Sequence, residues 1–179
     1  MNFTQTDILG CYQVVLNDFN DLRGGFFKTF HFDFFKEKKL TTDWKEEYFS
    51  TSKKNVIRGM HFQTPPEDHA KLVTCLTGSV IDVIVDLRKD SETFKKHISI
   101  LLDASSKNKM IYIPKGCAHG FLSLEDNTLM HYKVSSVYSA EKDMGILWST
   151  IGFDWKCDHP IISERDKRHT SLHEFQSPF

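Results

Sequence analysis

The sequence predicts an all-β fold, a sandwich or barrel of short strands with only a few short helices. Short runs rich in β-branched and aromatic residues follow one another closely, and Gly, Pro, Asn and Asp separate them. The 179 residues include 15 Phe, 5 Tyr and 3 Trp, which suit a sheet-rich core. Because no internal repeat, low-complexity tract or linker interrupts the chain, we expect one domain over residues 1–179.

Nine segments read as strands in chain order, and turn signals at 65–66, 77–78, 114–116 and 126–127 separate several of them. The one predicted helix covers 32–39 and opens near Asp33. Ser163 is followed by acidic residues, which predicts a capped turn or short helix over 163–166. The nine predicted strands are 11–16, 46–50, 55–62, 72–76, 79–87, 98–102, 110–113, 119–124 and 128–134.

Strand parity assigns side chains to faces, because successive residues point to opposite sides of a sheet. Within 79–87 one row is wholly apolar, whereas the other carries Asp82 and Asp86, two acids that need partners. Within 128–134, Tyr132 is expected to point inward if His131 and Lys133 face water. The Tyr132 hydroxyl then needs a hydrogen-bond partner inside the barrel.

Composition and charge exclude several classes of protein. The net charge of −1 gives no field that would recruit nucleic acid or an anionic membrane surface. No apolar run approaches the ~20 residues that span a bilayer, and we find no signal peptide. The four cysteines form no C-x-x-C motif. We therefore expect a reduced, cytoplasmic protein without a membrane partner.

A first segment with chemical potential is Asn55 to Gln63, which contains Arg58 and His61. Strict alternation would place Arg58 and His61 on opposite faces, but a bulge at Gly59 would bring both to one face. An Arg beside a His inside a barrel suits a phosphate and a base. From this segment alone, a structural His with a surface Arg is equally acceptable.

A second segment, Pro114 to Phe121, has the pattern P-x-G-x-x-H. It resembles the second motif of the cupins, which implies a double-stranded β-helix, or cupin-type jelly roll. Metal-dependent cupins carry H-x-H and then Glu in their first motif. Here that position reads His61-Phe62-Gln63, and the next histidine is His69 in a Pro-rich loop. A ligand set of His61, Gln63 and His119 is poor for a divalent transition metal, so we expect the fold without its metal.

Several motifs in order then resemble the dTDP-4-dehydrorhamnose 3,5-epimerase family over about residues 20–167. Together they are far more specific than any single motif. They are Arg58 to Gln63, Lys71 to Val73, Gly78 to Arg88, Ser91 to Phe94, Ile113 to Phe121, Tyr132-Lys133, Gly145 to Trp148 and Ser163 to Asp166.

The resemblance implies an isomerase without cofactor or metal that epimerises carbons next to the C4 ketone of a nucleotide-linked sugar. His61 would abstract the proton, and Asp166 would orient His61. Tyr132 would supply a proton on the other face of the ring. Lys71 and His119 would lie near the C4 oxygen and stabilise the enolate.

The resemblance also implies binding residues and a homodimer. Arg58 and Arg23 would contact the diphosphate, with Arg23 reaching in from the partner subunit beside an exchanged N-terminal strand. Asp82 would fix His119. The other substrate-binding positions implied are Phe26, Lys28, Glu46, Tyr48, Gln63, Tyr138, Trp148 and Arg165.

The recognition positions depart from the dTDP enzymes. Lys28 stands where they carry Glu, and Glu46 and Tyr48 stand where they carry Gln and Asn. We therefore expect a nucleotide other than dTDP, with GDP first and CDP next, on a 4-keto-6-deoxyhexose or 4-keto-heptose for bacterial surface (capsule) polysaccharide.

Several alternatives stay open. One is dTDP-4-dehydrorhamnose 3,5-epimerase proper, and others are a C3-only epimerase and a 3,4-ketoisomerase of the same fold. A rival of a different class is a non-catalytic sugar-binding cupin, which would be expected to have lost His61 or Asp166.

Overall fold

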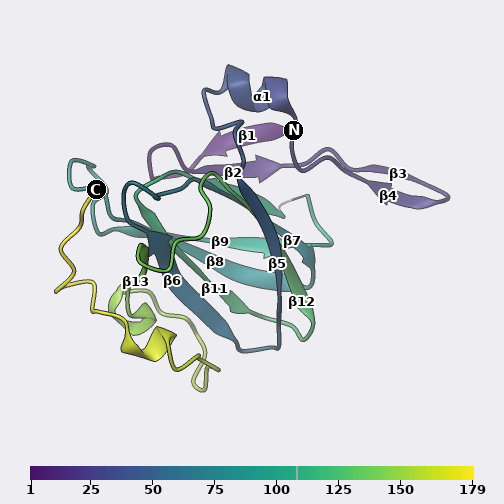
Figure 1. Ribbon diagram of the computed structural model, residues 1–179. Helices are drawn as coiled ribbons and strands as arrows, with labels where there is room; N and C mark the ends of the chain where they lie inside the picture. Colours follow the sequence, from purple (N-terminus) through teal and green to yellow (C-terminus); the bar gives the residue numbers. More distant parts are fainter. Residues whose placement is uncertain (108) are drawn as a thin grey trace.

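Two antiparallel sheets lie face to face in the computed structural model, which describes residues 1–107 and 109–179 (Figure 1). The first sheet has the strand order β1-β2-β10-β7-β12-β5, and the second has β13-β6-β11-β8-β9. Strands β3 and β4 form a separate hairpin. The arrangement confirms the predicted all-β jelly roll.

The nine predicted strands correspond to β2 and β5 to β12. Sequence patterns missed β1, β3, β4 and β13, which are only three or four residues long. The strands are β1 Asn2–Gln5, β2 Tyr12–Val15, β3 Phe19–Asp21, β4 Gly24–Phe26, β5 Glu46–Ser52, β6 Ile57–Gln63, β7 Lys71–Thr77, β8 Ser79–Asp86, β9 His97–Asp103, β10 Met110–Ile113, β11 Cys117–Ser123, β12 Thr128–Val134 and β13 Asp143–Gly145.

Helical structure is sparse, as predicted. Helix α1 spans Phe32–Glu37 and ends two residues before the predicted boundary, because Lys39 adopts a left-handed backbone with φ of 56°. Two 3₁₀ turns follow, η1 at Trp148–Thr150 and η2 at Asp166–Arg168. Among the described residues, the helices are all too short and too polar to cross a membrane.

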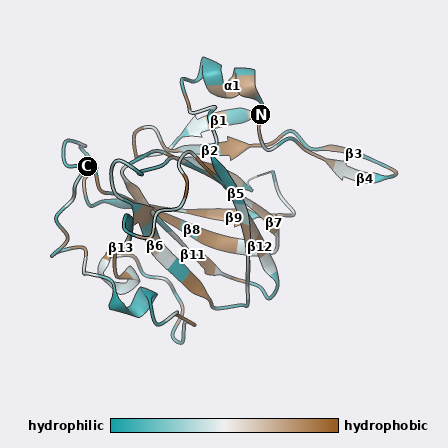
Figure 2. Cartoon of the chain, viewed as in Figure 1, coloured by the Kyte–Doolittle hydropathy of each residue, from teal (hydrophilic) through white to brown (hydrophobic). Residues whose placement is uncertain are grey.

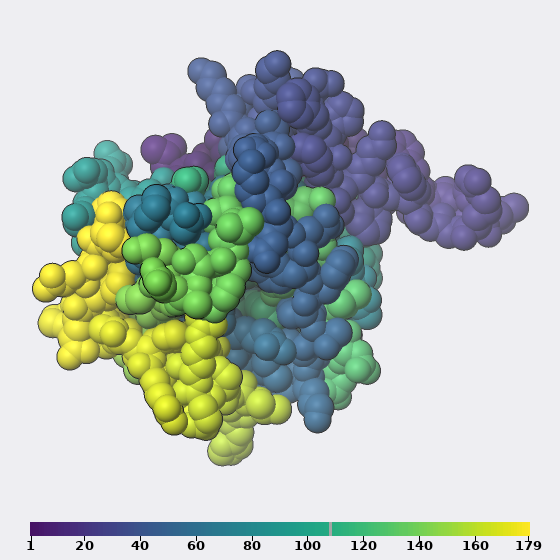
Figure 3. Space-filling model, viewed as in Figure 1, coloured from purple at the N-terminus to yellow at the C-terminus, as the bar shows by residue number. Residues whose placement is uncertain are grey.

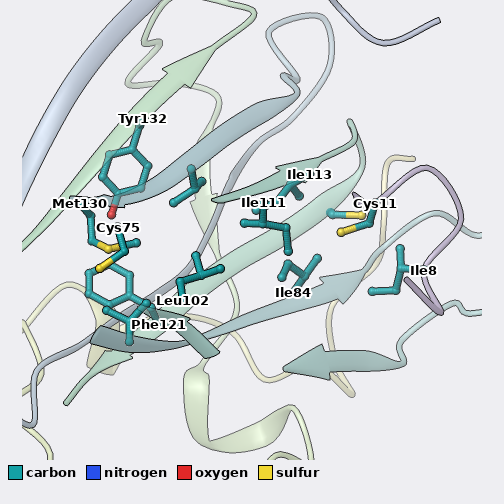
Figure 4. Close-up of a cluster of buried hydrophobic side chains, with 13 residues drawn as sticks. Ile8, Cys11, Cys75, Ile84, Leu102, Ile111, Ile113, Phe121, Met130 and Tyr132 are labelled. Carbon is teal, nitrogen blue, oxygen red and sulfur yellow. The ribbon is translucent and has the colours of Figure 1, made fainter. Parts of the chain in front are cut away.

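The space between the two sheets holds the inner core, in which Ile84 and Phe121 of one sheet pack against Val73, Ile111 and Met130 of the other. Figure 4 shows this core running from Ile8 and Cys11 at one end to Tyr132 at the other. Tyr132 therefore lies where the core gives way to a polar region.

The apolar row of β8 faces away from this space. Val83, Val85 and Leu87 are buried on the outer side of the five-stranded sheet, where Trp155 and Phe175 of the C-terminal segment cover them. Both faces of β8 are thus buried. The strand is accordingly rich in hydrophobic residues, which Figure 2 draws in brown. The Asp82 side of β8 consequently points between the sheets.

A third core lies on the outer side of the six-stranded sheet, where Phe35 of α1 covers Met110 and Tyr112. The β3–β4 hairpin protrudes from this side of the molecule (Figures 1 and 3). Its large apolar side chains Phe19 and Leu22 are exposed. Nothing in the described residues of the same chain covers the tip.

The condition set for β12 holds only in part. His131 lies on the outer face, opposite to Tyr132, but it is buried and not exposed to water. Its Nε2 lies 2.5 Å from Glu47 Oε1, and the ring of Phe49 stacks obliquely against it at 4.9 Å. A partner on the neighbouring strand β5 therefore shields a residue that alternation alone placed in solvent.

The four cysteines are free thiols in the structure. Cys11, Cys75 and Cys117 are buried, and burial raises the pKa of the Cys75 thiol to about 11. A reduced state and a cytoplasmic location stay predictions.

Candidate active site

A cavity of about 390 Å³ opens between the two sheets at the Tyr132 end of the inner core. Most of the residues predicted for the site line it, and they come from β5, β6, β7, β11, β12 and two loops. The lining comprises Glu46, Tyr48, Ser50, Arg58, His61, Phe62, Gln63, His69, Lys71, His119, Phe121, Tyr132, Val134, Tyr138, Asp143 and Arg165.

His61 and Asp166 form a hydrogen-bonded pair at the wall of this cavity. The His61 Nε2 lies 2.8 Å from Asp166 Oδ1, and Asp166 Oδ2 accepts a hydrogen bond from the Gly59 N–H at 3.1 Å. Burial by itself raises the pKa of Asp166, but the bonds from His61 and Gly59 outweigh it and hold the pKa at about 2. Since an ionised carboxylate only accepts, the neutral form of His61 has its proton on Nε2 and the lone pair on the other imidazole nitrogen, Nδ1.

Two glycines bring the flanking backbones into contact. A Cβ on Gly59 would lie 2.5 Å from the Gly120 Cα, and Gly59 has a φ of +142°. The β6–β11 pairing shifts register here, between His119 opposite His61 and Phe121 opposite Arg58. Arg58 and His61 both line the cavity, so the predicted bulge that brings them to one face is confirmed.

Tyr132 faces His61 from the opposite sheet. It lies on β12 of the six-stranded sheet, whereas His61 lies on β6 of the five-stranded sheet. The inward direction predicted from parity is confirmed, and the Tyr132 hydroxyl lies 3.2 Å from Ser50 Oγ. Burial raises the pKa of Tyr132 well above its usual range, so the phenol is protonated at neutral pH.

Lys71 and His119 supply the cationic and donor groups of the cavity. Lys71 Nζ donates to the His61 backbone oxygen at 3.1 Å, and burial lowers the pKa of Lys71 to about 8. His119 Nε2 lies 2.8 Å from Oδ2 of Asp82, which is fully buried. The pairing expected from the resemblance is therefore present, and the second acid of β8, Asp86, pairs with Arg88 instead.

The donor set does not fit the metal site of metal-dependent cupins. Gln63 would have to supply the second ligand, but its amide is committed to the protein. Its Nε2 lies 2.8 Å from the Glu67 carbonyl oxygen, and its Oε1 accepts from the Ser139 N–H at 2.6 Å. The imidazoles of His61 and His119 are each directed to a carboxylate as well. No step of the chemistry is routed through a metal at these residues.

The remaining lining residues form the wider, recognition side of the cavity. Arg58 donates to Ser52 Oγ at 3.0 Å and to the Thr51 carbonyl at 2.8 Å. Tyr48 stacks on Tyr132 with ring centroids 4.8 Å apart and an interplanar angle of 18°. Tyr48 therefore narrows the approach to the phenol of Tyr132.

Two other predicted binding residues connect loops to this side. Arg165 pairs with Asp143 at 2.7 Å, and Glu46 accepts from the Tyr138 backbone N–H at 2.8 Å. This ion pair and this hydrogen bond therefore connect residues 138–143 to Arg165 and to β5. Tyr138 itself remains exposed at the cavity edge.

Four predicted binding residues are not brought to the cavity of their own chain. Arg23, Phe26 and Lys28 belong to the projecting hairpin and its exit, and Arg23 has a side-chain exposure of 90% and pairs with Asp21. Trp148 packs against Trp155 in the outer core. Trp148 does not reach the cavity because it lies on η1, on the outer side of the five-stranded sheet.

Sequence patterns missed three titratable residues of the site region. His69 lies in a loop, where strand parity assigns no face, and Asp143 begins β13, which is too short for alternation to show. His169, just after η2, places its Nε2 3.5 Å from Asp166 Oδ1. Of these three residues, only His69 could have been suspected from the sequence, because it stands two residues before Lys71, which was itself a predicted site residue.

Comparison with known proteins gives the family. The family model for dTDP-4-dehydrorhamnose 3,5-epimerase matches residues 5–174. The chain is 37% identical to the Shigella flexneri dTDP-4-dehydrorhamnose 3,5-epimerase over 169 residues, with 93% of each chain covered.

Solved structures agree with this assignment. The Elizabethkingia anophelis dTDP-4-dehydrorhamnose 3,5-epimerase superimposes with a TM-score of 0.91 at 33% identity, covering 97% of both chains. A Legionella pneumophila dTDP-6-deoxy-D-glucose-3,5-epimerase, solved with dTDP-4-keto-L-rhamnose, has a TM-score of 0.91 at 31% identity and covers 98% of this chain and 94% of its own. The chain belongs to the dTDP-4-dehydrorhamnose 3,5-epimerase family and is a sugar-nucleotide epimerase, an isomerase.

Proposed function

We propose that the protein inverts C3 and C5 of a dTDP-linked 4-keto-6-deoxy sugar, with His61 as base and Tyr132 as acid. The observation that carries the proposal is the placement of His61, its tautomer held by Asp166, across the cavity from the protonated phenol of Tyr132. Inversion requires removal of a proton on one face of the ring and delivery on the other.

The chemistry follows from the C4 ketone of the substrate. The Nδ1 lone pair of His61 takes the proton from the carbon next to the ketone, and the bonding electrons move onto the C4 oxygen as an enolate. Lys71 stabilises this negative charge as an ammonium ion, and His119 donates to it from Nδ1 when its ring is protonated beside Asp82. The enolate then collapses, and the carbon takes the proton of the Tyr132 hydroxyl.

Each group is suited to its role at neutral pH. Lys71, with a pKa of about 8, is mostly protonated at pH 7. Asp166, with a pKa of about 2, stays ionised and stabilises the imidazolium that forms on His61. The ketone is supplied by the substrate, so the steps above call on no cofactor.

The choice of dTDP rests on the relatives. The Legionella enzyme was solved with dTDP-4-keto-L-rhamnose, and the matching family model carries the dTDP substrate in its description. The expectation of GDP, which Lys28, Glu46 and Tyr48 motivated, gains no support from these names. It remains a second candidate because Glu46 and Tyr48 do line the cavity. A heptose substrate and a role in surface polysaccharide synthesis also stay predictions.

The proposal includes a homodimer in which the β3–β4 hairpin carries Arg23 into the partner's cavity. Arg23 does not line the cavity of its own chain, and the hairpin exposes Phe19, Leu22 and Phe26. Apolar side chains on a projecting hairpin are typical of a surface that another chain covers. A fully active monomer in sedimentation experiments would contradict this.

Substrate choice and the number of inverted centres can be measured together. The enzyme is incubated with dTDP-, GDP- and CDP-linked 4-keto sugars in deuterated water, and mass spectrometry counts the deuterium atoms taken up. We expect two exchanged positions on the dTDP sugar. One exchanged position indicates a C3-only epimerase, movement of the ketone indicates a 3,4-ketoisomerase, and no exchange on any sugar supports the non-catalytic sugar-binding cupin.

A further inference from the structure

A second imidazole lies beside the His61–Asp166 pair. His169 Nε2 is 3.5 Å from Asp166 Oδ1, and its ring stands at 79° to the ring of His61 with centroids 5.8 Å apart. The Nε2 atom is buried and has no hydrogen-bond partner within residues 1–107 and 109–179. The proposed proton transfers leave this nitrogen without a role.

The fold fixes His169 in this place from both sides. The neighbouring Thr170 forms a parallel bridge with Ile146, and its carbonyl accepts from the Leu147 N–H at 2.9 Å. In the β6–β13 ladder, Gly145 pairs with His61, and a Cβ on Gly145 would overlap the His169 ring. The absence of a side chain at Gly145 thus leaves the room in which the second imidazole lies against the first.

The three side chains present the ligand set of a transition-metal ion. One atom each of His61, Asp166 and His169 lie within 4.8 Å of one another. Ligand atoms about 2.1 Å from a tetrahedral zinc ion are ~3.4 Å apart, so only small movements of the side chains are needed. Two imidazoles and one carboxylate are a common zinc set that leaves a fourth position for water.

We propose that His61, Asp166 and His169 bind Zn²⁺, and that the bound ion switches off the epimerase by occupying Nε2 of its base. This set differs from the metal site of other cupins, since it uses neither Gln63 nor His119. Only His61 is common to both.

The charges around the three residues are compatible with a cation. Asp166 supplies a carboxylate, and the His169 Nε2 atom is buried without a hydrogen-bond partner among the described residues, so it is available to coordinate. Of the nearby cations, Arg165 is paired with Asp143 at 2.7 Å, and Lys71 Nζ donates to the His61 carbonyl oxygen at 3.1 Å. The Asp166 carboxylate is the anionic ligand that the ion would meet.

The inhibitory effect follows from the tautomer of His61 and rests on the proposed function. A neutral imidazole has one proton, which lies on Nε2 while Asp166 accepts it. Zinc at Nε2 moves that proton to Nδ1, the nitrogen that must remove the substrate proton. The substrate still binds, but no enolate forms, so kcat falls while KM changes little.

Calorimetry with Zn²⁺ on the intact protein tests the site without any substrate. We expect one ion per chain. We expect His169→Ala and His169→Gln to bind zinc at least ~10-fold more weakly, because losing even a residue that only supports a metal ligand lowers metal affinity by about this factor. His173→Ala, which removes an exposed histidine from the same segment, should bind as the unaltered protein does. Equal affinity in all of these variants, or no stoichiometric binding by the unaltered protein, overturns the proposal.

Deuterium exchange tests the inhibition separately. Zinc should stop exchange by the unaltered enzyme and by Cys157→Ser, and a chelator should restore it. His169→Ala, normalised to its own rate without zinc, should keep exchanging at the same zinc concentration. Inhibition of His169→Ala at an unchanged zinc concentration refutes the proposal. If no keto sugar is turned over at all, the proposed function fails while the calorimetric result still decides the zinc site.

Discussion

The two sides of the cavity differ in how firmly the chain holds their side chains. On the chemical side, His61 and His119 are each bonded at 2.8 Å to a buried carboxylate, and both strands meet at the Gly59–Gly120 contact. On the recognition side, Tyr138 is exposed at the cavity edge, and Arg23, on the hairpin outside the cavity of its own chain, protrudes into solvent. The difference indicates that the chain preorganises the side chains on the chemical side, whereas those on the recognition side are left free to move, as the proposed homodimer requires.

The largest expected effect lies on the chemical side. Replacing His61 with Asn should abolish deuterium exchange at every centre, because no enolate forms without the base. Mass spectrometry in deuterated water measures this directly. Asp166→Asn, which disturbs the orientation of His61 without removing the base, should leave a measurable remainder. Residual exchange in His61→Asn equal to that in Asp166→Asn would show that another group takes the proton.

A second test separates exchange from inversion. In Tyr132→Phe the base can still remove a proton and return a solvent-derived one to the same face. Deuterium should enter with retained configuration, while net epimerisation falls ~10²–10⁴-fold, as for a typical general acid. NMR of the product gives the ratio of the two. If both processes vanish together, Tyr132 is needed to form the enolate, and the assigned role is wrong. Phe preserves the packing of the ring, so a folding defect should not imitate the result.

The buried ammonium of Lys71 predicts an alkaline limit to activity. Burial lowers its pKa to about 8, so the cation is present below this pH and is lost as the pH rises through it. Exchange should therefore decline above about pH 8, and Lys71→Met should cost ~10²–10³-fold at pH 7, the usual cost of losing an oxyanion donor. Lys71→Arg serves as the control, since its guanidinium stays charged and should move the limit upward. An unmoved limit in Lys71→Arg would assign it to another group.

The smallest effect is expected on the recognition side. Arg23→Ala should raise KM about 10–100-fold with little change in kcat, because a hydrogen bond to a charged group contributes ~1.5–3 kcal/mol. Steady-state kinetics measure the two constants, and Arg168→Ala removes a comparably exposed arginine outside the cavity. Equal KM values in the two variants would show that the hairpin does not reach a ligand, which would break the comparison above.

Local patterns predicted the fold and the interior of the site well. Alternation in β12 correctly turned Tyr132 toward the space between the sheets, and alternation in β8 correctly separated an apolar row from the row of Asp82 and Asp86, because each strand has one face on the inner core. The Gly59 bulge could also be predicted, since a residue without Cβ is the usual place for one. The length of these strands and the alternation of their residues were sufficient to predict them.

Other parts of the site could not be derived from periodicity. Asp166 stands 105 residues after His61 on a 3₁₀ turn, and its place beside His61 was expected only from the family resemblance. His169 follows in a segment held by an isolated bridge, for which no strand pattern exists. The hairpin carrying Arg23 has strands of three residues, too short for alternation to show.

Because Gly59 and Gly120 are in contact, the substitutions tolerated at one position depend on the residue at the other. A Cβ on either residue would collide with the backbone of the other strand, since one on Gly120 would lie 2.8 Å from the Arg58 carbonyl oxygen. A side chain at either glycine consequently shifts the strand that carries the other imidazole of the cavity, so the effects of substitutions at the two positions should not add. Directed evolution toward new sugars is therefore best confined to β5 and the hairpin, where a substitution leaves the crossing of β6 and β11 intact.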